Sequence, residues 1–232
     1  MGAKLCAYCG SNQAADRDHV IPKSLYPQSK RPQGSDVQLI TVPVCKACHL
    51  SFPDETHFRQ VVVVAGPPNA AVLELWDGPV ARSICGCDGP RRVDDLFRRF
   101  HYAEVPGGRR TMIYPAEDES VLGTTRKIIR GICAHFGLGW AVPDEDVLTD
   151  VLRFVVPPEI LEAMTYWDCQ ADIFSCRCQL MHGIAGMHSA WLLTFFGRTT
   201  FTGIVADRGT AGDEWRQMRR AQAARYGHGA QP

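Results

Sequence analysis

Two closely spaced cysteine pairs form the most specific chemical pattern in this chain. Cys6 and Cys9 make the first pair, Cys45 and Cys48 the second, and each pair is separated by two residues. Four thiolates complete the tetrahedral coordination of zinc, and such a closed site is structural because it leaves no position for a substrate. Zinc then supplies folding free energy to a segment too short to bury its own core. The spacing predicts a structural Zn²⁺; the alternative is four unrelated cysteines among the 10 of the chain.

Acidic and imidazole side chains lie close to both cysteine pairs. Asp18 and His19 are adjacent and lie between the pairs, and His49 directly follows Cys48. In an extended segment, neighbouring side chains point to opposite faces, so one of Asp18 and His19 can face a metal while the other faces a substrate. The alternative is a histidine that only packs or lies on the surface.

The order and spacing of these pieces resemble the HNH endonucleases of the ββα-metal class, in the branch that carries a four-cysteine zinc. The resemblance covers about the first 60 residues and rests on the two cysteine pairs, on DHVIPKS at 18–24 and on LITVPVCKACH at 39–49. It implies a metal-dependent endonuclease that hydrolyses phosphodiester bonds, with DNA as the expected partner and RNA not excluded. It also implies a setting in bacterial or phage defence, restriction or mobile-element biology.

The resemblance assigns roles to individual residues. His19 would be the general base, since a neutral imidazole can accept a proton near neutral pH. Asp18 and His49 would hold a catalytic divalent cation, Mg²⁺ or another, which can offset charge developing on the phosphate. The family commonly has an asparagine before the second cysteine pair that orients the base through its backbone carbonyl, and Gln38 is the expected replacement. His57 and Asp54 are candidates for a third ligand, with a shell completed by waters as the alternative.

The remainder of the chain predicts an α+β protein, in which the zinc-stabilised ββα module of residues 1–60 precedes a mixed helical and antiparallel β domain. Residues 61–140 are expected to be a mainly helical, basic region, and residues 141–232 an α+β region with a C-terminal β-hairpin and a terminal helix. Asn69 is a predicted N-cap. Helices are expected at 58–65, 70–77, 94–100, 120–137 and 213–227, and strands at 110–114, 152–156, 173–180, 190–196 and 199–206.

Basic side chains of the middle region are candidate phosphate contacts, which would provide affinity and register but little sequence information. The alternative is a solvated helix face, and the acidic stretch at 142–152 is likewise expected to be a solvated face. The candidate nucleic-acid-binding residues are Lys23, Arg91, Arg92, Arg98, Arg99, Arg109, Arg110, Arg126, Lys127 and Arg130.

Composition excludes several classes of protein. The 25 basic and 25 acidic residues exclude a polybasic tail protein, and the apolar runs are too short for a membrane span. We expect a cytoplasmic protein with reduced cysteines. Cys85 and Cys87 could pair with Cys176 and Cys178 at a second metal site, but buried thiols are the preferred interpretation.

Two functions compete with the nuclease. One is a zinc-containing nucleic-acid-binding module that has lost catalysis, which the replacement by Gln38 favours. The other is an effector subunit that cleaves only with a protein partner; association with such a partner or with further copies of the chain is left open.

Overall fold

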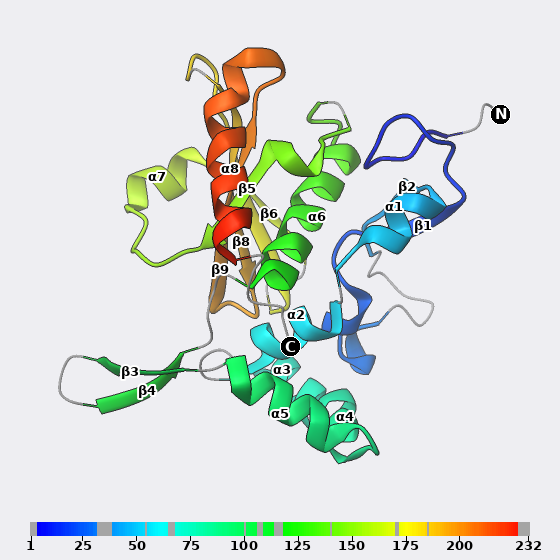
Figure 1. Ribbon diagram of the computed structural model, residues 1–232, viewed down its shortest axis with the longest axis vertical. Helices are drawn as coiled ribbons and strands as arrows, with labels where there is room; N and C mark the ends of the chain where they lie inside the picture. Colours follow the sequence, from blue (N-terminus) through cyan, green and yellow to red (C-terminus); the bar gives the residue numbers. More distant parts are fainter. Residues whose placement is uncertain are drawn as a thin grey trace.

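The protein has a mixed α+β fold with a five-stranded antiparallel sheet (Figure 1). The computed structural model describes residues 4–31, 39–53, 55–64, 68–99, 101–105, 109–113, 118–139, 141–169, 172–184 and 186–226, with the backbone alone for 101–105, 109–113 and a few residues inside helices.

The N-terminal unit consists of two short strands and a helix. Strand β1 (Asp16–His19) pairs antiparallel with β2 (Thr41–Val44), with His19 opposite Thr41, and α1 (Lys46–Ser51) follows. Along β2 the side chains alternate between the core and the outer face, while on β1 Asp16 and Arg17 are exposed and Asp18 is buried. The order of the unit is therefore β–β–α, with the predicted base at the end of its first strand.

The large sheet has the strand order β5-β9-β8-β7-β6. Its strands are β5 (Val147–Val151), β6 (Thr165–Asp168), β7 (Phe174–Leu180), β8 (Met187–Phe195) and β9 (Thr199–Ala206). Phe196 and Gly197, both at positive φ, make the tight turn between β8 and β9. The predicted strands at 173–180, 190–196 and 199–206 and their hairpin are confirmed.

The strand predicted at 152–156 was wrong, and the solvated face predicted for the acidic stretch does not hold at Asp146. The strand expected at 152–156 lies earlier, as β5, while Phe154 and Val155 are exposed. Asp146, just before β5, is buried because its Oδ1 accepts a hydrogen bond from Arg216 Nε at 2.6 Å. A carboxylate compensated in this way can precede a core strand, so this part of the stretch is not a solvated face.

Helix α6 (Glu119–His135) lies between the sheet and the N-terminal unit (Figure 1). A Cβ at Gly131 would lie 2.8 Å from both methyl carbons of Val20, and one at Gly203 of β9 would lie 2.2 Å from Ile129 Cδ1. Glycine at these two places lets α6 approach both neighbours closely. The helix is consequently buried along most of its length on both sides.

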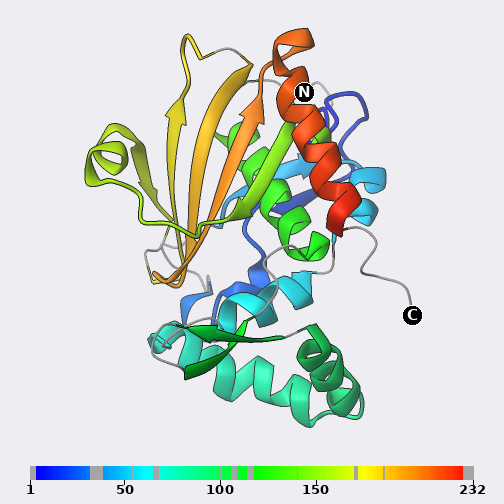
Figure 2. The ribbon, with the colours of Figure 1, turned by 60° about the vertical axis from the view of Figure 1, so that its left-hand side comes forward.

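Several of the other helices and a small hairpin lie together at one end of these layers (Figure 2). Asn69 caps α3 as predicted, because its Oδ1 accepts a hydrogen bond from Val72 N at 2.9 Å. The remaining α-helices and strands, with a π-helical turn, are α2 (Glu55–Val64), α3 (Ala70–Leu75), the π-helical turn (Trp76–Val80), α4 (Ala81–Cys85), α5 (Gly89–Arg99), β3 (His101–Val105), β4 (Arg109–Ile113), α7 (Pro158–Ala163) and α8 (Asp213–Tyr226).

The buried hydrophobic side chains form one cluster. It includes Tyr8 and Val20 of the N-terminal unit, Phe58 of α2 and Phe195 and Phe201 of the sheet. The N-terminal unit thus packs into the same core as the sheet. Among the helices of the described residues, none has the length and apolar character that a membrane crossing requires.

Candidate functional site

The four cysteines of the two predicted pairs come together in the structure. Their sulfur atoms all lie within 4.8 Å of one another, and the Cys9 and Cys45 sulfurs are 3.9 Å apart. Zinc–sulfur bonds of about 2.3 Å in a regular tetrahedron place the sulfurs about 3.8 Å apart. The cluster therefore fits a metal such as zinc in size and in ligand chemistry.

Hydrogen bonds to the sulfurs prepare the cluster for a cation. Cys45 is the N-cap of α1, and its Sγ accepts hydrogen bonds from Cys48 N and Asn12 Nδ2. Hydrogen bonds from Ser11 and the Asn12 backbone lower the pKa of Cys9 to about 6. Burial raises the pKa of Cys48. Thiolates bind metal. Four neighbouring thiolates repel one another, so a bound cation would be needed for all four cysteines to ionise.

The predicted base, His19, is half-buried at the end of β1. Burial, followed by the positive charge of Lys23, lowers the pKa of the imidazole below its ordinary value. The ring is therefore neutral at pH 7, the form that accepts a proton. Lys23 itself is exposed, in a 3₁₀ turn shortly after β1, where it can contact a phosphate.

Asp18 is held inside the protein. Its Oδ2 accepts a hydrogen bond from the Tyr8 hydroxyl at 2.6 Å and lies 3.0 Å from Lys127 Nζ. Within the described part of the chain, the four cysteines are the one group of three or more candidate ligands close enough to share a metal. Asp18 thus has an internal ion pair where the resemblance implied a bond to a catalytic cation.

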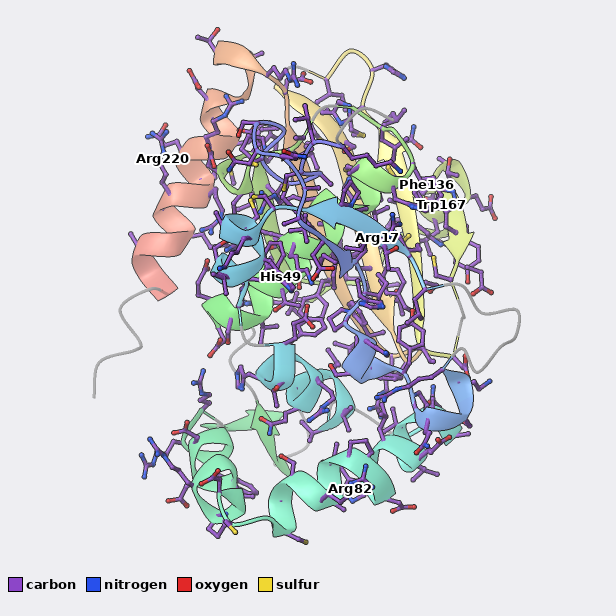
Figure 3. The ribbon with its side chains drawn as sticks, turned by 90° about the vertical axis from the view of Figure 1, so that its right-hand side faces the viewer. Arg17, His49, Arg82, Phe136, Trp167 and Arg220 are labelled. Atoms are coloured by element: carbon purple, nitrogen blue, oxygen red, sulfur yellow. The ribbon has the colours of Figure 1, made fainter. Side chains whose placement is uncertain are left out.

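The other implied ligands have different surroundings from Asp18. His49 is exposed on α1, 6.4 Å from Phe52 between ring centroids, and Figure 3 shows it on the side of the molecule formed by the N-terminal unit. His57 Nε2 instead lies 3.7 Å from Oδ2 of Asp118, the N-cap of α6. Gln38 and Asp54 lie outside the described residues.

Asp118 joins α2, α5 and α6. Burial alone would raise its pKa, but hydrogen bonds from His57 and Ser120 and the charge of Arg99 outweigh burial, so the pKa falls below its usual range. His57 and Arg99 therefore help to hold the start of α6, a structural task that the sequence did not indicate.

The predicted phosphate contacts divide into exposed and internal side chains. Arg91 and Arg98 are exposed on α5. Arg126 is 3% exposed and forms ion pairs with Glu119 and Asp144, while Arg130 donates to the backbone carbonyls of Tyr8 and Val142.

Lys127 belongs to the internal group, at 2% exposure. Arg126 and Lys127 are too deeply buried to reach a phosphate of a duplex while the protein stays folded. For Arg92, Arg109 and Arg110, the side chains lie outside the described residues.

The second set of cysteines makes no metal site among the described residues. Cys85 and Cys87 are exposed at the end of α4 and just after it, whereas Cys176 and Cys178 are buried on the core side of β7. The interpretation as buried thiols is confirmed for Cys176 and Cys178.

Sequence reasoning missed Tyr8 and Glu55 and gave Lys127 a different role. Tyr8 lies inside the first cysteine pair, but no local pattern marks it as a partner of Asp18. Lys127 contacts Glu55 and the carbonyl of His19, which are 72 and 108 residues away along the chain. Contacts over such separations leave no periodic signal in the sequence.

Comparisons with models of protein families, with curated proteins and with solved structures found no match. The resemblance to HNH endonucleases therefore rests on the motifs and their spacing.

Proposed function

We propose that this chain is an HNH-type endonuclease that hydrolyses DNA phosphodiester bonds with His19 as the general base. One observation carries the proposal: a β–β–α unit closed by a four-cysteine cluster has an accessible histidine of lowered pKa at the end of its first strand. The motif residues that suggested the family are thus accompanied by a ring in the protonation state that a base requires.

The chain's own residues would act at two points of the reaction. His19 takes a proton from a water molecule, whose oxygen then attacks phosphorus as the bond to the leaving oxygen breaks. The leaving oxygen takes up a proton from solvent. Lys23, whose positive charge helps to lower the pKa of His19, offsets negative charge on the bound phosphate.

No step of this reaction is assigned to a catalytic divalent cation. Asp18 is buried and paired with Lys127, and His49 alone offers one ligand at an exposed position. Apart from the cysteine cluster, the described residues hold no group of three or more candidate ligands close enough to share a cation. A cation that contributes to the reaction would depend on the substrate phosphate and on waters for most of its ligands.

The internal pairing of Asp18 favours one alternative. A zinc-stabilised module that binds nucleic acid without cutting it would need the cysteine cluster and the exposed cations, but not a free carboxylate beside His19. This alternative differs from the nuclease only in the absence of cleavage.

A plasmid assay tests the proposal. The purified protein is incubated with supercoiled DNA in the presence of Mg²⁺, Mn²⁺ or EDTA, and binding is measured in parallel. Nicked or linear products support the nuclease, and their loss in EDTA would show that a cation is needed. Salt-sensitive binding without cleavage favours the binding module, and neither binding nor cleavage contradicts both.

Removing two exposed arginines of α5 should weaken the salt dependence of DNA binding. With Arg91→Gln and Arg98→Gln together, the slope of log affinity against log salt should flatten by up to about 1.8, because each phosphate contact contributes about 0.9. The double variant Arg153→Gln, Arg208→Gln removes the same charge from positions outside the predicted set. Equal slopes for the two double variants would exclude α5 as a phosphate-binding surface.

A further inference from the structure

The ammonium group of Lys127 makes contacts in three directions inside the protein. Nζ lies 3.0 Å from Asp18 Oδ2 and 3.2 Å from the backbone oxygen of His19, and it also pairs with Glu55 Oε1. A lysine ammonium has three N–H donors and no acceptor. Two of these donors have hydrogen-bond partners, the His19 carbonyl and Glu55, and the ion pair with Asp18 is the third contact that restrains the group.

The surroundings provide what a buried cation needs. Two carboxylates oppose the single positive charge, and the ring of Phe52 lies 4.9 Å from Nζ. Breaking such a buried pair by removing one partner is costly, because the remaining charge loses its compensation. The Tyr8 hydroxyl donates to the same carboxylate oxygen of Asp18, so the acid is also fixed in place.

These contacts act on the backbone around His19. The register of β1 and β2 ends at His19 opposite Thr41, and the next hydrogen bond runs from Val20 N to Ile40 O. Lys127 holds the carbonyl of His19 and, through its carboxylate, the residue before it. The backbone that orients the imidazole is thus fixed from both sides of the His19 Cα.

The close packing of helix α6 on the N-terminal unit places Lys127 beside Asp18 and His19. One turn after Lys127, Gly131 allows the helix to approach Val20 and the Tyr8 hydroxyl. Between them, Arg130 donates to the carbonyl of Tyr8 at 3.0 Å. The same face of α6 therefore contacts the N-terminal unit at residues close to the candidate base.

We propose that Lys127 is a positioning residue of the candidate site, through which helix α6 fixes the backbone of His19 and makes the N-terminal unit dependent on the rest of the chain. This inference rests on the proposed nuclease function. In it, Asp18 serves to hold Lys127 and the strand end. At 2% exposure Lys127 does not touch substrate, so it acts through His19.

Lys127→Met tests the inference, with Arg130→Met as the matched control. Both remove an α6 cation that contacts other elements, but the partners of Arg130 are the carbonyls of Tyr8 and Val142 and the carboxylate of Asp144. We expect Lys127→Met to lower kcat by about 10²-fold, the effect of misplacing a catalytic group by about 1 Å. KM should stay near the wild-type value, because the lysine does not bind substrate. Arg130→Met should lower the melting temperature but leave kcat far less affected.

A second measurement does not depend on activity. The side-chain resonances of His19, assigned with His19→Ala in long-range ¹H–¹⁵N spectra, should shift in Lys127→Met and remain in place in Arg130→Met. If the wild type cuts no DNA but these shifts occur, the nuclease proposal fails and the coupling of Lys127 to His19 stands. If kcat and the resonances follow the melting temperature equally in both variants, the role of Lys127 is only structural and the inference is wrong.

A milder variant covers the case in which Lys127→Met does not fold. Lys127→Arg keeps the charge that the two carboxylates require, but its longer, planar guanidinium cannot make the same three contacts. We expect a folded protein whose kcat falls by about tenfold or more, with shifted His19 resonances. Wild-type kcat and resonances in folded Lys127→Arg would overturn the inference.

Discussion

His19→Ala should lower the rate of DNA cleavage by about 10²- to 10⁴-fold, the usual contribution of a positioned general base. The fold should persist, because the side chain is only half-buried and its strand is held by backbone hydrogen bonds to β2. Zinc content should also persist, since the cysteine cluster does not include His19. Single-turnover cleavage with excess protein measures the chemical step apart from product release.

A variant of a second exposed histidine is the control for this result. His182 is exposed in the turn between β7 and β8 and has no part in the proposed site. His182→Ala should therefore cleave at a rate close to that of the wild type. A wild-type rate in His19→Ala would remove the base assignment, and an equal loss of rate in both variants would indicate general damage to the protein.

DNA affinity separates the base from a binding residue. If His19 acts only in the chemical step, His19→Ala should bind DNA about as tightly as the wild type. A large loss of affinity with an unchanged single-turnover rate would move His19 from the catalytic to the binding machinery. That outcome would favour the module that binds nucleic acid without cleavage.

Local patterns predicted much of the fold. The cysteine pairs, the N-cap at Asn69, helix α6 and the strands β7, β8 and β9 each depend on residues within one segment. Side-chain alternation and capping act over a few residues, so the sequence carries them directly. For the same reason the order β–β–α around the cysteines was accessible from the motifs.

Ion pairs between residues far apart along the chain could not be predicted from the sequence. Asp146 is buried because Arg216, 70 residues later, compensates it, and a charge count along the chain could not distinguish this from a solvated carboxylate. The cations of α6 present the same difficulty, because their partners lie in other elements. An amphipathic pattern locates a polar face but does not say whether water or protein covers it.

Disrupting the cysteine cluster should cause a large loss of folding stability. Cys45→Ala should abolish metal binding by the cluster, because it removes one of four ligands, and it also removes the N-cap of α1. Zinc binding contributes on the order of 10 kcal/mol to folding in small zinc modules, so we expect a loss of at least about 5 kcal/mol of stability. For a chain of this length, that corresponds to a melting temperature lower by about 10–20 °C.

The expected loss should be cooperative across the whole chain. If the N-terminal unit unfolds, Gly131 loses its contact with Val20, and Lys127 and Arg130 lose their partners in that unit. Unpaired buried cations on α6 would then destabilise the helix on which the sheet packs. We therefore expect a single transition at lower temperature, followed by circular dichroism and by a sheet reporter such as Trp191, with Cys85→Ala as the exposed-cysteine control. A wild type purified without zinc would contradict the metal centre, and a sheet transition unchanged in Cys45→Ala would show that the N-terminal unit folds independently.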